Sequence, residues 1–99
     1  MEWRESFRGP FLEMAHQRHR RIADWVSRGE DAELRSAASE LHCLSGEASM
    51  LDYGDVAESA RVAEEAARKG DRINLAKHVS ELWAAIKAVE SGGEMAKGP

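Results

Sequence analysis

The chain has 99 residues, 14 Lys or Arg against 18 Asp or Glu, and a formal net charge of −4. This length predicts one domain around one core, and the acidic balance argues against nucleic acid as the main partner. Only two prolines occur, and plentiful alanine and glutamate favour an all-α fold. No apolar run is long enough to predict a membrane span. The single cysteine, Cys43, predicts a reducing, cytoplasmic setting.

The first predicted helix covers residues 10–28. Pro10 cannot continue a preceding helix but suits a first helical position. We therefore expect residues 1–9 to form an N-terminal extension, either a frayed start or a short leading helix. Apolar or aromatic side chains recur through the predicted helix at three- and four-residue steps, as on the buried face of a packed helix: Leu12, Ala15, His19, Ile22 and Val26.

The second predicted helix starts just after Asp31, a good N-cap residue, and ends near residue 52. Its apolar stripe is formed by Leu34, Ala37, Leu41, Leu44, Ala48 and Leu51. His42 lies beside this stripe, on an edge that carries only small neighbours: Ala38, Ser45, Gly46 and Ser49. A glycine inside a helix costs roughly 0.5–1 kcal/mol relative to alanine. Here it leaves room for a partner to approach the imidazole one turn away.

Two further helices are predicted after Gly54 and after Asp71. The third starts at Asp55, where Glu58 three residues later imitates a capping box, and it ends before Gly70. Its stripe is small: Val56, Ala60, Ala63 and Ala67. The fourth carries Leu75, Val79, Leu82, Ile86 and Val89. Short connections force neighbouring helices to be antiparallel. We therefore predict an up-down-up-down four-helix bundle over residues 10–91 and a flexible tail over residues 92–99.

The stretch from His42 to Ala48 resembles the phosphoacceptor motif of histidine phosphotransfer (Hpt) domains. That family's pattern reads His-x-x-Lys-Gly inside the second helix of a four-helix bundle. His42, Gly46 and the small Ala48 match it. Ser45 stands where the family has lysine. The resemblance extends over residues 11–88, because the number, order and spacing of the helices also fit.

The resemblance implies that His42 is a phosphoacceptor whose Nε2 exchanges a phosphoryl group with a receiver-domain aspartate in a two-component phosphorelay. The implied partners are a response-regulator receiver domain, a histidine kinase, or both. We expect a monomeric carrier that has no cofactor, no metal and no ATP site of its own. Two alternatives stay open: the phosphoacceptor domain of a chemotaxis-like histidine kinase, and a non-catalytic helical adaptor that docks a receiver or kinase.

The resemblance also suggests partners for His42. Glu64 lies as far after Tyr53 as His42 lies before it, so an antiparallel turn at Tyr53 could place the two side by side. In chemotaxis-kinase domains a glutamate at this separation bonds Nδ1–H and leaves Nε2 free. Ser45 and Arg61 are candidate phosphoryl contacts, and Ala38, Gly46 and Ser49 form the predicted docking edge.

Two other features are open to a functional interpretation. His16 and His19 could share a helix face, but no further ligands accompany them at metal-binding spacing, so we expect packed or half-exposed histidines. The basic run over residues 18–21 could touch nucleic acid. Within an acidic chain we interpret it as a solvated face or a docking rim.

Overall fold

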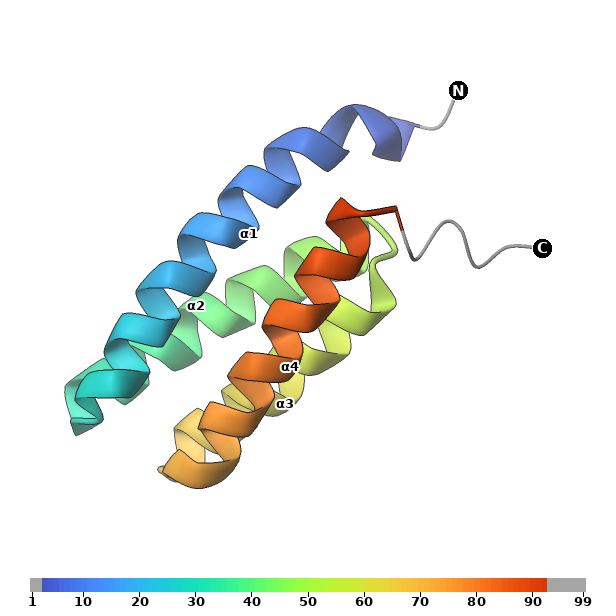
Figure 1. Ribbon diagram of the computed structural model, residues 1–99. Helices are drawn as coiled ribbons and strands as arrows, with labels where there is room; N and C mark the ends of the chain where they lie inside the picture. Colours follow the sequence, from blue (N-terminus) through green and yellow to red (C-terminus); the bar gives the residue numbers. More distant parts are fainter. Residues whose placement is uncertain (1–2, 93–99) are drawn as a thin grey trace.

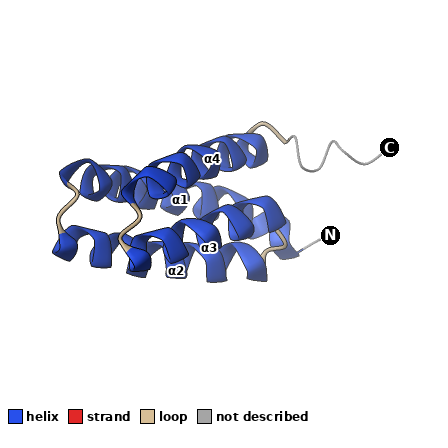
Figure 2. Cartoon of the chain, turned by 90° about the horizontal axis from the view of Figure 1, so that it is seen from below, coloured by secondary structure: helices blue, strands red, loops and turns tan. Residues whose placement is uncertain are grey.

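The computed structural model describes residues 3–92, which form an antiparallel bundle of four helices (Figure 1). The helices are α1 (Trp3–Arg28), α2 (Asp31–Met50), α3 (Gly54–Lys69) and α4 (Arg72–Glu90). The described residues contain no strand (Figure 2). Connections of two or three residues turn each helix back along its predecessor, as antiparallel neighbours require. The predicted all-α four-helix bundle is confirmed.

Each helix packs against two neighbours around the bundle. α2 lies between α1 and α3, and α4 closes the ring by packing against α3 and α1. Within the described residues no Cα atom of α2 lies within 8 Å of one in α4, so these two helices are diagonally opposed across the core. No helix in the described part of the chain has an 18-residue window apolar enough to cross a membrane.

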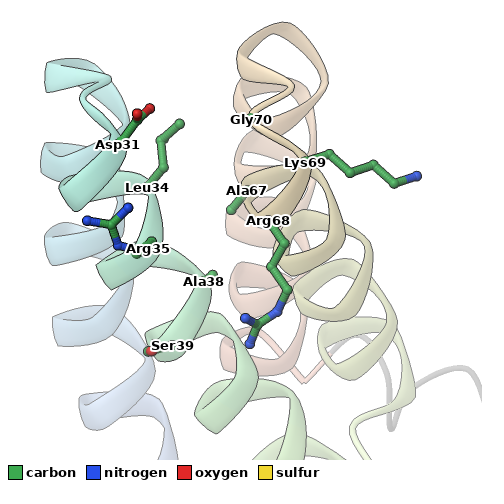
Figure 3. A pocket seen from close by; sticks show the side chains of 9 residues that line it. All are labelled: Asp31, Leu34, Arg35, Ala38, Ser39, Ala67, Arg68, Lys69 and Gly70. Carbon is green, nitrogen blue, oxygen red and sulfur yellow. The ribbon is translucent and has the colours of Figure 1, made fainter.

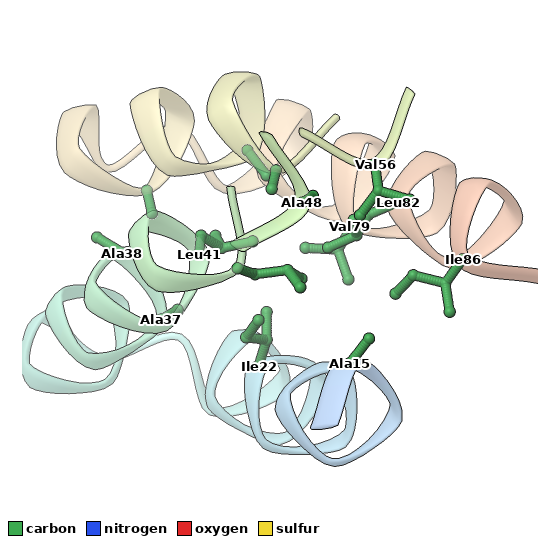
Figure 4. Close-up of a cluster of buried hydrophobic side chains, with 14 of the residues drawn as sticks. Ala15, Ile22, Ala37, Ala38, Leu41, Ala48, Val56, Val79, Leu82 and Ile86 are labelled. Carbon is green, nitrogen blue, oxygen red and sulfur yellow. The ribbon is translucent and has the colours of Figure 1, made fainter. Parts of the chain in front are cut away.

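The predicted apolar stripes meet in one core (Figure 4). Ile22, Leu41 and Leu82 are fully buried at its centre, and each such side chain stabilises the fold by roughly 1.5–3 kcal/mol. α3 contributes mostly alanines to this core, including Ala60 and Ala63. Because alanine side chains are short, α3 can lie close to both of its neighbours. The site described below depends on this closeness of α2 and α3.

The start of α1 differs from the prediction. The helix begins at Trp3 and passes through Pro10, so the described part of the expected extension belongs to the same helix. Gly9 precedes the proline and has no Cβ to clash with its ring. Arg8 donates from Nη2 to the carbonyl oxygens of Val89 and Glu90, at 2.6 and 2.9 Å. This bond ties the first turns of α1 to the end of α4. The division into extension, bundle and tail stays a prediction, and residues 93–99 lie outside the described residues.

The helix caps were predicted only in part. α4 starts after Asp71 as expected, and Asp71 caps it, because its Oδ1 accepts the backbone N–H of Asn74 at 3.2 Å. Asp31 is the first residue of α2 rather than its cap, and no side chain caps that helix. The capping box predicted at Asp55 is wrong, because the N-cap of α3 is Tyr53, whose side chain makes no capping hydrogen bond, and Glu58 pairs with Arg61.

The turn between α2 and α3 sets their relative position. Asp52 takes a left-handed backbone with φ of 65°, and the N–H of Tyr53 returns to the carbonyl of Ala48 at 2.9 Å. The ring of Tyr53 is buried with its centroid 5.0 Å from that of Phe11 on α1. The turn is therefore held against a third helix. The three-residue length of the turn limits which residues of α2 and α3 can lie opposite each other.

Candidate functional site

His42 projects from the middle of α2 into solvent. Its neighbours Leu41 and Leu44 are fully buried and fix the rotation of the helix. The imidazole is therefore directed away from the core, and 73% of the side chain is exposed. Nε2 has no hydrogen-bond partner among the described residues. A neutral imidazole with an unoccupied ring nitrogen can act as a nucleophile.

Glu64 on α3 lies against the other ring nitrogen. Each of its carboxylate oxygens is 3.3 Å from Nδ1 of His42, and only 15% of the glutamate side chain is exposed. The structure thus brings together the two residues that the symmetry about Tyr53 paired. A carboxylate at this position can accept the Nδ1 hydrogen and select the tautomer whose Nε2 carries the lone pair.

A third residue, Arg68, joins this pair and was missed from the sequence. Its Nε and Nη2 lie 2.9 and 2.7 Å from Oε2 of Glu64. Arg68 and Glu64 are four residues apart on α3, a spacing that favours ion pairs. The spacing was therefore a usable signal in the sequence.

The two predicted phosphoryl contacts are both engaged elsewhere. The hydroxyl of Ser45 donates to the carbonyl oxygen of Ala57 on α3 at 3.2 Å. Arg61 binds both oxygens of Glu58, at 3.2 and 2.8 Å. That hydrogen bond lowers the pKa of Glu58 and raises the pKa of Arg61. Neither side chain bonds to His42 or Glu64 in the described structure, so their role toward a phosphoryl group stays a prediction.

The predicted docking edge is exposed at only two of its three positions. Gly46 and Ser49 are exposed, and a Cβ built on Gly46 would meet no atom within 4 Å. Ala38 is different because it is only 2% exposed. It packs in the core, so it can offer a partner only the floor of a surface groove. This corrects the expectation that Ala38 contributes an exposed docking contact.

That groove runs between the start of α2 and the end of α3 and has a volume of about 590 Å³ (Figure 3). Its wall includes Arg35 and Ser39 from α2 and Arg68 from α3. Arg35, Ser39 and His42 follow one another at helical spacing along the same side of α2. In Figure 3 Arg68 extends into the space between the two helices, whereas Lys69 points away. The groove therefore continues the surface around His42 toward this end of the bundle.

The histidines of α1 pack against α4. Nε2 of His16 lies 3.3 Å from Oε2 of Glu90, and the rings of His16 and His19 lie 5.2 and 4.8 Å from Trp83. Nε2 of His19 faces the carbonyl oxygen of Val79 at 3.3 Å. Burial lowers the pKa of His19. No cluster of three or more metal-ligating side chains occurs in the described part of the chain.

Within the basic run on α1, Arg20 and Arg21 are exposed, as expected of a solvated face, whereas Arg18 forms a structural clasp. The Arg18 side chain is 13% exposed, and its guanidinium donates to Glu40 at 2.7 Å and to Glu47 at 2.9 Å, both on α2. Arg21 also donates to Glu40, at 3.2 Å. Burial alone would lower the pKa of Arg18, but the bonds to the two glutamates outweigh it and raise that pKa. Arg18 is therefore occupied in holding α1 to α2.

The fold and the site define the class of protein: it is an antiparallel four-helix bundle with an exposed histidine on its second helix. The comparison with protein families agrees, because the Hpt domain family matches residues 6–92. The chain belongs to the Hpt domain family. Its general role is thus histidine phosphotransfer in a phosphorelay, in contact with receiver domains or kinases. Searches of curated proteins and of solved structures gave no significant match.

Proposed function

We propose that this protein carries a phosphoryl group on Nε2 of His42 and exchanges it with the aspartate of a response-regulator receiver domain. One observation carries the proposal: an imidazole that is 73% exposed has Nδ1 against a mostly buried carboxylate and Nε2 open to solvent. This arrangement supplies a nucleophile and the group that orients it.

In the proposed transfer the phosphoryl group passes directly from the receiver's aspartate to Nε2 of His42. The lone pair of Nε2 attacks phosphorus, and the phosphorus–oxygen bond of the aspartyl phosphate breaks with its electron pair left on the receiver's carboxylate. Nδ1 keeps its hydrogen, so the phosphorylated ring carries a positive charge next to Glu64. The carboxylate stabilises that charge electrostatically. The reverse reaction returns the phosphoryl group to an aspartate by the same path.

The partner would dock on the exposed side of α2 around His42. Gly46 and Ser49 give this side little relief, and Met50, one turn beyond Gly46, is 72% exposed. Small and apolar exposed side chains are suited to a protein interface. On binding a phosphorylated receiver, Ser45 and Arg61 would have to exchange their present partners to touch the phosphoryl group.

A second candidate is supported by the serine at position 45. The family lysine offers a cation one turn from the histidine, whereas a serine hydroxyl supplies a hydrogen bond without charge. A domain of this kind could dock a receiver or kinase as an adaptor without transferring phosphate. The phosphoacceptor domain of a chemotaxis-like kinase would instead show the same chemistry with phosphate that arrives from a kinase domain.

The test is to incubate the protein with a panel of phosphorylated receivers and to follow acid-labile, base-stable phosphate. We expect label on His42 alone and none in His42→Gln. His78 offers a matched control, because its Nδ1 also contacts a glutamate, Glu81 at 2.9 Å, but on α4. His78→Gln should be labelled normally. Label retained in His42→Gln would refute the assignment, and no label with any receiver would favour the adaptor.

A further inference from the structure

Arg68 is the cation most directly connected to the phosphoacceptor. A single atom, Oε2 of Glu64, lies 3.3 Å from Nδ1 of His42 and 2.7 Å from Nη2 of Arg68. Both Nε and Nη2 of the guanidinium bind that same oxygen. Such a two-point contact restricts the rotation of the carboxylate, and charge-assisted hydrogen bonds of this length are strong ones.

The other cationic side chains near His42 do not bind the carboxylate of Glu64. Arg61 is bound to Glu58 through two hydrogen bonds. Arg35 lies on the same side of α2 two turns away, and no ion pair joins it to Glu64 in the described structure. Position 45, where the family has lysine, holds an uncharged serine whose hydroxyl faces Ala57.

From α1, on the other side of α2, the charged side chains that reach α2 are Arg18 and Arg21, and both are paired with Glu40. They are therefore occupied in holding the two helices together. The charged groups that most directly affect the imidazole are thus Glu64 and Arg68, which binds Glu64.

A lone carboxylate beside an imidazole has two opposed effects on its use as a nucleophile. It selects the tautomer with the free Nε2, but it also favours the protonated ring, which has no lone pair to attack with. A guanidinium bound to an oxygen of the same carboxylate offsets the negative charge and keeps the orientation. Arg68 is placed to have this effect.

We propose that Arg68 is a positioning residue for the phosphoacceptor: it fixes Glu64 against Nδ1 of His42 and offsets the charge of that carboxylate, so that the ring is held with Nε2 toward solvent. This inference rests on the proposed function of His42. It assigns Arg68 no contact with the phosphoryl group, and its effect passes through Glu64.

The experiment uses phosphoramidate as a small-molecule donor, so no receiver needs to be identified. Nε2 attacks phosphorus as the phosphorus–nitrogen bond breaks and ammonia leaves. Phosphohistidine formation is followed by ³¹P nuclear magnetic resonance from mildly acidic to mildly alkaline pH. The proteins compared are the wild type, Arg68→Gln, Arg68→Lys and Arg35→Gln. The last removes the same charge from the same groove without touching Glu64.

In Arg68→Gln the rate at neutral pH should fall by about two- to fivefold, the factor that corresponds to a partly exposed ion pair. Arg68→Lys should recover part of the rate because it keeps the charge. In Arg35→Gln the profile should stay as in the wild type. The ¹⁵N spectrum of His42 should show less of the Nδ1–H tautomer in Arg68→Gln alone.

The inference is overturned if the profile and the tautomer of Arg68→Gln match the wild type, or if Arg35→Gln changes both equally, since only the general charge would then matter. Circular dichroism checks that each variant is folded. Failure of the proposed function looks different: wild-type protein would take no phosphate from any donor, or His42→Gln would still take it. The tautomer measurement needs no phosphate and tests Arg68 in either case.

Discussion

Gly46 offers a way to separate the docking surface from the stability of the fold. It lies inside α2, it is exposed, and a Cβ at this position would meet nothing within 4 Å. Gly46→Ala should therefore gain the full difference in helix propensity, about 0.8–1 kcal/mol. For a domain of this size that gain corresponds to a rise in Tm of about 4–8 °C. Gly46→Gln should also be more stable than the wild type, by about half as much.

The same substitutions should have the opposite effect on transfer. Glutamine adds a flexible side chain one turn from His42, in the path of an approaching receiver, so Gly46→Gln should transfer phosphate more slowly than Gly46→Ala. Ser80→Gln is the matched control, because Ser80 is an exposed residue of α4 and α4 lies diagonally opposite α2. Its transfer rate should stay that of the wild type.

Two measurements decide the matter: thermal unfolding by circular dichroism, and the rate of phosphate uptake from a receiver that labels the wild type. A Gly46→Gln protein that is stabilised and transfers at the wild-type rate would refute the proposed docking surface. A fall in Tm for Gly46→Ala would instead refute the structural argument, because it would mean that the position is not an open helical site.

Three further predictions concern stability. Gly70 has φ of 73° and an open Cβ position, so Gly70→Ala should lower the free energy of unfolding by about 1–2 kcal/mol through backbone strain alone, measurable by urea denaturation. Arg18→Met should cost about 1–3 kcal/mol by removing two charge-assisted bonds; a double-mutant cycle with Glu40→Gln should show strong coupling, and additive losses would contradict the clasp. Burial lowers the pKa of His19 in the folded protein. The neutral His19 ring therefore contributes to the free energy of unfolding above the unfolded pKa of about 6.5, and this contribution is lost as pH falls through the lower folded pKa. Tm should therefore fall more on mild acidification in the wild type than in His19→Gln, and equal falls would contradict the assignment.

The sequence predicted the features that repeat along a helix. The stripes of α2, α3 and α4 are buried as expected, because apolar residues at three- and four-residue steps can be covered only by other helices. The pairing of His42 with Glu64 could also be predicted from the sequence, because a short turn at Tyr53 leaves an antiparallel hairpin little freedom of register.

What the sequence did not show depends on contacts between helices. Pro10 suggested a helix start. Gly9 removes one steric objection to continuing the helix, the clash of the proline ring with a preceding Cβ, and the bonds from Arg8 to the end of α4 hold the earlier turns in place. The clasp of Arg18 depends on how α1 is rotated about its axis relative to α2. Periodicity alone does not fix that rotation closely enough to choose partners for long side chains.

The short turn between α2 and α3 has a consequence for the order in which the molecule folds. His42 and Glu64 are 22 residues apart in the chain, and closing a loop of this length costs about 1 kcal/mol less entropy than joining α1 to α4, where Arg8 and Val89 are 81 residues apart. Contacts that are local in sequence generally form early and quickly. We therefore expect the α2–α3 hairpin to bring His42 and Glu64 together before α4 docks. The hairpin alone would then form the site, and α1 and α4 would mainly stabilise it.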